Sequence, residues 1–237
     1  MNRGIMYALA AAVLFGVSTP FAKLLVGAIQ PLLLAGLLYA GSGLGLLLVL
    51  GARRILASGG SSISLPERGE WAWLGAAILF GGVAGPVALM YGLVRTAAST
   101  ASLLLNLEAV FTAVLAWLLF RENYERRVAL GMLSIVAGGL VLAWTPGQST
   151  QVSAGAMLVA AACLFWALDN NLTRKVAARD ALLIASLKGL AAGVVNIGLA
   201  LVFSAPSPSV EIIASPAAVG LVGYGICLVL LLPAFGD

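Results

Sequence analysis

The sequence predicts an all-α integral membrane protein with about eight transmembrane helices. Hydrophobic residues make up 62% of the 237-residue chain and charged residues only 9%, whereas a typical soluble domain is about 25% charged. A soluble protein this apolar would have too few polar residues to cover its surface. The apolar residues fall into runs of about 20, the length that crosses a bilayer. The 28 glycines suit close packing of helices in lipid.

Eight predicted spans follow one another along the chain. They cover residues 4–22, 31–50, 71–94, 97–120, 128–144, 154–172, 181–203 and 216–235. A Gly/Ser-rich stretch at 58–64 and the Pro-Ser-Pro sequence at 206–208 are expected to be loops. Pro20 is expected to kink the first helix, because proline has no backbone N–H to donate.

The distribution of Lys and Arg sets the expected orientation. With the N-terminus in the cytoplasm, ten of these residues fall in cytoplasmic segments and one, Arg95, falls in an outside loop. This bias predicts a multi-pass protein of the cell (inner) membrane with a cytoplasmic N-terminus. The net charge of +4 therefore indicates topology. The expected partner is the lipid bilayer, no nucleic acid is expected, and the sequence leaves the oligomeric state open.

An internal repeat divides the chain. Residues 4–15 align with residues 155–166 at a constant offset of 151, sharing a glycine, a methionine and two alanines. The first and sixth spans then correspond, so the repeat unit has five helices. Units with an odd number of helices enter the membrane from opposite sides and form an inverted repeat, which is typical of secondary transporters. We expect residues 1–147 to form the first unit and 148–237 three helices of the second, which makes the sequence look incomplete at its C-terminus.

The composition disfavours an enzyme. The chain contains no histidine, which removes Ser-His-Asp and Cys-His catalysis and metal or haem sites built on histidine. Cys163 and Cys227 lie inside apolar runs, so we expect buried, inert thiols, and no metal-binding spacing is present. We therefore expect no catalytic residue, metal or cofactor. A membrane-embedded enzyme is kept as a less favoured alternative.

Glu108 is a candidate functional residue because it lies near the middle of the fourth span. An ionisable side chain at this depth costs roughly 2.5–3.5 kcal/mol, so it marks a site by default. Thr112 lies one turn later on the same face. Glu108 is predicted to face the bundle interior, as a proton carrier or as an acceptor for a cationic group of a substrate. The alternative is a structural carboxylate bonded to neighbouring backbone and hydroxyl groups.

A second group of candidates lies on the sixth and seventh spans. Asp169 and Asn170 are near the cytoplasmic end of the sixth, and Lys188 lies in the cytoplasmic half of the seventh, on a face of small residues that also carries Asn196. At 1.5 Å per residue the depths of Asp169 and Lys188 differ by about 6 Å, so we predict an ion pair. The alternatives are that Asp169 meets the headgroups, that Lys188 extends toward them, or that Lys188 pairs with Glu108.

Three segments of the chain resemble the EamA-type transporters of the drug/metabolite transporter superfamily. They are residues 15–23, residues 106–122, which are the most specific match, and residues 166–175. The resemblance implies ten helices in two inverted five-helix repeats around a central cavity, and export of amino acids and other metabolites. It implies here a secondary transporter that exports a small-molecule metabolite, with a non-transporting truncated fragment as the alternative.

Overall fold

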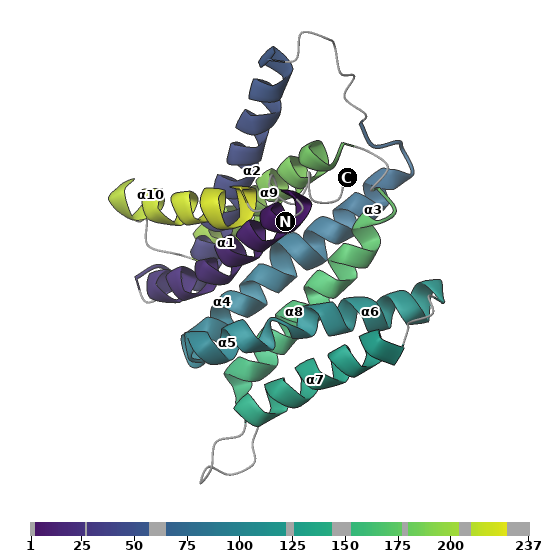
Figure 1. The fold of residues 1–237 in the computed structure, drawn as a ribbon. Helices are drawn as coiled ribbons and strands as arrows, with labels where there is room; N and C mark the ends of the chain where they lie inside the picture. The colour runs from purple at the N-terminus through teal and green to yellow at the C-terminus, as the bar shows by residue number, and fades with distance from the viewer. Residues whose placement is uncertain are drawn as a thin grey trace.

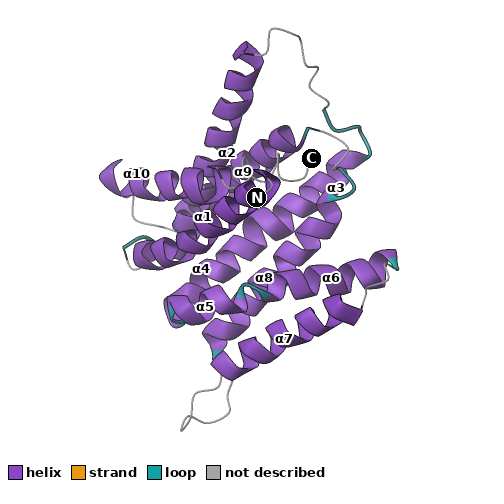
Figure 2. Cartoon of the chain, in the orientation of Figure 1, coloured by secondary structure: helices purple, strands orange, loops and turns teal. Residues whose placement is uncertain are grey.

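The computed structural model describes residues 3–26, 28–56, 65–121, 126–143, 153–176, 180–203 and 210–226. Every regular element within these ranges is a helix (Figures 1 and 2). The elements in chain order are α1 (Arg3–Val26), α2 (Pro31–Leu56), α3 (Glu70–Ala77), the π-helix η1 (Ile78–Ala84), α4 (Gly85–Arg95), α5 (Ala98–Leu104), α6 (Leu107–Phe120), α7 (Arg126–Ala143), α8 (Ala154–Thr173), α9 (Ala181–Val202), α10 (Val210–Val219) and the π-helix η2 (Gly220–Ile226). The predicted all-α class is confirmed.

Five segments in the described part of the chain are long and apolar enough to cross a membrane. They are Pro31–Ile55, Glu70–Arg95, Ala98–Leu119, Ala154–Thr173 and Ala181–Val202. Shorter apolar helices cover Ala12–Val26 and Ala214–Gly223. Large apolar side chains on the outer faces of the helices are exposed, among them Leu24 at 73% and Val202 at 76%. Such exposure suits a surface covered by lipid.

Several predicted spans differ from the structure in their details. The third span is one continuous rod, but its middle turn is the π-helix η1. The fourth span, predicted as a single helix, is interrupted at Leu105 and Asn106 between α5 and α6. The eighth begins at Val210, earlier than predicted, and its predicted end lies outside the described residues. Pro20 lies within α1, and a kink there stays a prediction.

Polar side chains define where two helices begin. The Ser153 hydroxyl accepts a hydrogen bond from the Ala156 N–H at 3.1 Å and starts α8. The Asp180 carboxylate accepts from the N–H groups of Leu182 and Leu183 and starts α9. Each satisfies donors that have no partner within the helix. These caps fix the start of the two helices that carry the second group of candidates.

Helices α2 and α9 cross in close contact at small residues. A Cβ atom built on Gly189 would lie 2.8 Å from the Gly43 Cα, and one on Gly193 would lie 2.7 Å from the Ala40 backbone nitrogen. Lipid is as apolar as the side chains, so packing of this kind holds membrane helices together. The small-residue face predicted around Lys188 is therefore a helix–helix interface, as expected.

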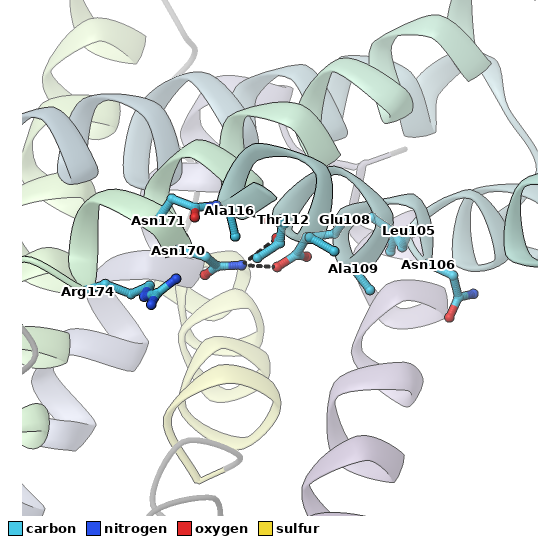
Figure 3. Close-up of a pocket in the computed structure, with 10 residues that line it drawn as sticks. Leu105, Asn106, Glu108, Ala109, Thr112, Ala116, Asn170, Asn171 and Arg174 are labelled. Carbon is cyan, nitrogen blue, oxygen red and sulfur yellow. Dashed lines mark hydrogen bonds between the residues drawn. The ribbon is translucent and has the colours of Figure 1, made fainter. Parts of the chain in front are cut away.

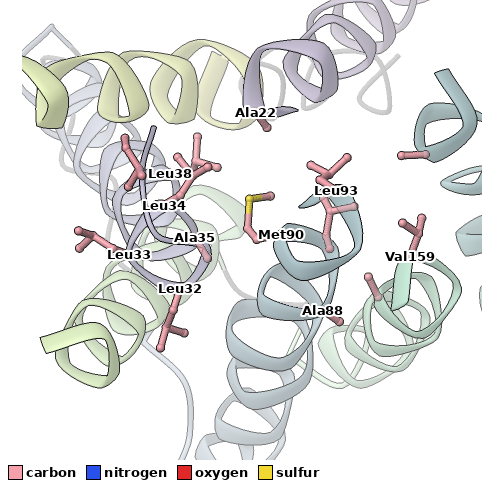
Figure 4. Packing of buried hydrophobic residues seen from close by; sticks show 14 of the residues in the cluster. Ala22, Leu32, Leu33, Leu34, Ala35, Leu38, Ala88, Met90, Leu93 and Val159 are labelled. Atoms are coloured by element: carbon pink, nitrogen blue, oxygen red, sulfur yellow. The ribbon is translucent and has the colours of Figure 1, made fainter. Parts of the chain in front are cut away.

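The main apolar cluster joins α1, α2, α4 and α8. Its buried members include Ala22 of α1, Leu34 of α2, Met90 and Leu93 of α4, and Val159 of α8. In Figure 4 these side chains converge between the helices. The cluster fixes α8 against α4, and α6 in turn packs on α8. Helix α7 lies beside α6 at one edge of the bundle (Figure 1).

Candidate functional site

A cavity of about 560 Å³ lies between α6 and α8. It is lined by Leu105, Asn106, Glu108, Ala109, Thr112, Ala113, Ala116, Asn170, Asn171 and Arg174. Figure 3 shows the polar side chains of α8 opposite the Glu108 face of α6. A concave, mostly apolar site with a few convergent polar groups is the usual form of a small-molecule site.

Glu108 stands at the first turn of α6 because the fourth span is broken just before it. The Asn106 side-chain amide donates to the carbonyl oxygens of Ser102 and Leu103, the latter at 3.0 Å, and so competes with continuation of the helix. The thiol of Cys163 donates to the Leu104 carbonyl oxygen at 3.4 Å. The break places the Glu108 carboxylate at a helix N-terminus, where the helix dipole favours negative charge.

Asn170 joins the two walls of the cavity. Its Nδ2 donates to Glu108 Oε1 at 2.9 Å and to Thr112 Oγ1 at 3.4 Å (Figure 3). Three of the predicted site residues therefore meet in one cluster. The Glu108 side chain faces α8 and the cavity.

Asn171 supplies a further polar group to this cavity. Its Nδ2 donates to the Thr112 carbonyl oxygen at 3.2 Å and to the Ala167 carbonyl oxygen at 2.8 Å. The residue is 2% exposed, and its Oδ1 has no hydrogen-bond partner among the described residues. A buried acceptor without a partner is costly. Asn171 is therefore a residue of the cavity lining with a buried acceptor that no described residue satisfies.

Asp169 and Lys188 form the predicted ion pair. Lys188 Nζ lies 2.5 Å from Asp169 Oδ1, and the two side chains are 18% and 11% exposed. The Thr173 hydroxyl donates to Asp169 Oδ1 at 2.8 Å, and Lys188 Nζ also donates to Thr173 Oγ1 at 3.0 Å. The predicted pair is confirmed, and Asp169 is buried in the bundle.

The π-helix η1 lies against this ion pair. A Cβ atom on Gly81 would lie 1.9 Å from Asp169 Oδ2, so only glycine leaves room for the carboxylate. The Gly85 N–H donates to the Phe80 carbonyl oxygen in the π register, and in that register the Gly81 carbonyl would need the N–H of residue 86. Residue 86 is proline and has none.

Side chains from three other helices satisfy the carbonyl oxygens of η1. The Gly81 oxygen accepts from the Tyr39 hydroxyl at 2.8 Å and from Trp166 Nε1 at 2.9 Å. The Gly82 oxygen accepts from Asn196 Nδ2 at 2.8 Å. Helices α2, α8 and α9 are thereby tied to one irregular turn. Asn196, predicted to share the face of Lys188, is fully buried here.

The predicted site residues therefore form two groups on different sides of α8. Glu108, Thr112 and Asn170 line the cavity. Asp169, Lys188 and Asn196 lie away from it, with the ion pair and η1. Sequence reasoning did not give Asn106 or Arg174 a place in the cavity. The amide at Asn106 was a usable signal, because an asparagine inside an apolar span needs partners.

Comparison with known proteins places the chain in a family. The sequence profile of the EamA-like transporter family matches residues 2–144, more than half of the chain. The chain belongs to this family. The predicted resemblance is confirmed.

Two relatives extend the comparison. An "Uncharacterized transporter" of Methanothermobacter thermautotrophicus is 28% identical over 203 residues, which are 81% of this chain and 59% of that protein. The chain thus spans less than two thirds of the length of this relative. A crystal structure of a protein with 20% sequence identity matches 96% of this chain and 77% of its own chain with a TM-score of 0.67. At that identity the likeness supports the fold alone.

Proposed function

We propose that this protein is a secondary transporter that exports amino acids or related small metabolites. The observation that carries the proposal is a cavity with a few convergent polar groups between two helical segments long and apolar enough to cross a membrane, in a chain of a transporter family. A carboxylate held at that depth is costly unless it has a function or a partner. The cavity offers the Glu108 carboxylate on the α6 wall and, in the α8 wall, the buried Asn171 Oδ1, and both groups accept hydrogen bonds.

Glu108 is the proposed contact for a proton or for the ammonium group of a substrate. An ammonium group brings three donors, and the carboxylate and the Asn171 amide oxygen are suitable acceptors. Asn170, whose Nδ2 also donates to Thr112 Oγ1, holds the carboxylate at the α8 side of the cavity. Arg174 at the same cavity is the proposed contact for an anionic group of the substrate.

The proposed transport path runs between two inverted repeats. The pattern of helix contacts supports this arrangement. The third span of the first unit, formed by α3, η1 and α4, packs against α8, the first helix of the second unit. The third span of the second unit, formed by α10 and η2, packs against α1. The second helices of the two units, α2 and α9, pack against each other. Reciprocal contacts of this kind are expected of two units related by a two-fold axis.

A vesicle assay tests the proposal. The full chain is reconstituted into liposomes preloaded with a mixture of unlabelled amino acids, and exchange with single radiolabelled amino acids is measured across a range of pH. We expect exchange of at least one amino acid, strongly reduced by Glu108→Gln. The matched control is Glu67→Gln, which makes the same change at an exposed residue outside the helices. No exchange above that of empty liposomes would refute the proposed substrate class, and unchanged exchange by Glu108→Gln would leave its carboxylate a structural role only.

A further inference from the structure

Three consecutive residues of α8 carry polar side chains that point to two sides of the helix. Asp169 points toward α9 and η1, where it contacts Lys188 and Gly81. Asn170 and Asn171 point toward α6, where they contact Glu108 and Thr112. Successive residues of an α-helix differ in direction by about 100°, so any rotation of α8 that moves one set of contacts moves the other.

Asp169 is held from three sides. Lys188 of α9 and Thr173, one turn along α8, both bond its Oδ1. On the side of Oδ2 lies Gly81 of η1, on which a Cβ atom would be 1.9 Å from that oxygen. A short side chain held in this way fixes the rotation of its own helix. Separating a buried ion pair is unfavourable, because either charge left alone in a low-dielectric site is costly.

We propose that the Asp169–Lys188 ion pair is a positioning device that sets the rotation of α8 and so keeps Asn170 against Glu108 and Asn171 against Thr112. Both charged residues act through α8 and make no contact with the transported solute. This proposal rests on the proposed function in one respect only, namely that the cavity between α6 and α8 is the solute site. The geometry that it predicts is measurable without a substrate.

The test measures the distance between α6 and α8 at the cavity. Thr112→Cys and Asn170→Cys are introduced together, with Cys227→Ser, and the full chain in lipid nanodiscs is treated with a short bis-methanethiosulfonate linker. Cys163 is buried and stays. We expect rapid crosslinking in this parent. Adding Lys188→Met should slow crosslinking at least about tenfold. A tenfold shift away from the crosslinking-competent arrangement requires less free energy than the loss of one member of a buried ion pair costs.

A control variant and a spectroscopic signal make the result specific. Lys23→Met removes another lysine within a span, whose Nζ donates to the Leu93 carbonyl oxygen away from the cavity, and it should leave crosslinking unchanged. The indole N–H resonance of Trp166, one turn before Asn170 and bonded to the Gly81 carbonyl, should move in Lys188→Met and stay in Lys23→Met. If Lys188→Met only made the protein less stable, its crosslinking rate and its Trp166 resonance would match those of Lys23→Met at temperatures well below unfolding.

The double variant Asp169→Asn with Lys188→Met covers the case in which the single variant does not fold. It leaves no unpaired buried charge, yet it lacks the pair, so we expect slow crosslinking there too. Parent-like crosslinking in Lys188→Met, or in the double variant, would overturn the proposal and assign the pair to charge balance alone. Because no solute is used, a failed exchange assay leaves this outcome unaffected.

Discussion

Replacing Gly81 by alanine is predicted to break the contact between η1 and the ion pair. The added Cβ would lie 1.9 Å from Asp169 Oδ2 and 2.3 Å from its Cγ, whereas real Cβ contacts below 3.0 Å are essentially absent. The carboxylate must retreat by more than 1 Å, but its Oδ1 is held by Lys188 and Thr173. At least one of these two hydrogen bonds is therefore lost, unless η1 moves instead.

The size of the effect follows from these contacts. Loss of a hydrogen bond to a charged group costs about 1.5–3 kcal/mol, and overpacking in a close-packed interior costs about 1–3 kcal/mol. Together they predict destabilisation by about 2.5–6 kcal/mol, which lowers the melting temperature by on the order of 10 °C for a chain of this size.

A thiol-reactive dye measures this stability, because Cys163 is buried and becomes reactive only on unfolding; the background again carries Cys227→Ser. The matched control is Gly75→Ala in α3, since a Cβ there meets no atom within 4 Å. Alanine at such a helical position is neutral or stabilising by up to about 1 kcal/mol. Equal melting temperatures for the two variants would refute the steric reasoning at Gly81.

Two further predictions concern energetics and topology. Asp169→Asn and Lys188→Met should each destabilise the protein by about 3–5 kcal/mol, and the double variant by less than the sum; additive losses in a double-mutant cycle would argue against energetic coupling of the pair. Reporter fusions after Gly147 and after Pro206 should report an outside location and a fusion after Glu125 an inside one; the reverse pattern would contradict the predicted orientation.

The spans and the ion pair were predictable from sequence for the same physical reason. A bilayer imposes a length of about 20 apolar residues on a helix, and it makes every charge within that length costly. Counting residues from the cytoplasmic basic clusters therefore gave the depths of Asp169 and Lys188, and helices joined by a short loop are usually neighbours. The 2.5 Å contact between them agrees with that estimate.

The irregular turns were harder to predict, because their partners are distant in sequence. The break before Glu108 depends on Asn106 and Cys163. The bonds of Asn106 are local and can be anticipated from the sequence, whereas Cys163 lies 58–59 residues away from the carbonyls that it contacts. Hydrophobic periodicity continues through the break, so it carries no signal. The division of the polar residues of α8 between two sides also required knowing which helices pack on each side.

The π-helix η1 shows how irregular backbone is accommodated at membrane depth. Pro86 deprives the preceding turn of a backbone donor, and in lipid an unpaired carbonyl would cost several kcal/mol. Tyr39, Trp166 and Asn196 supply donors from three helices instead. Gly81, whose carbonyl oxygen accepts two of these bonds, is also the residue that makes room for the Asp169 carboxylate. The turn that needs outside hydrogen bonds thus becomes the point where α2, α8 and α9 are fixed relative to one another. Because α8 is one of the three, a substitution at this turn is expected to reach the cavity on the other side of that helix.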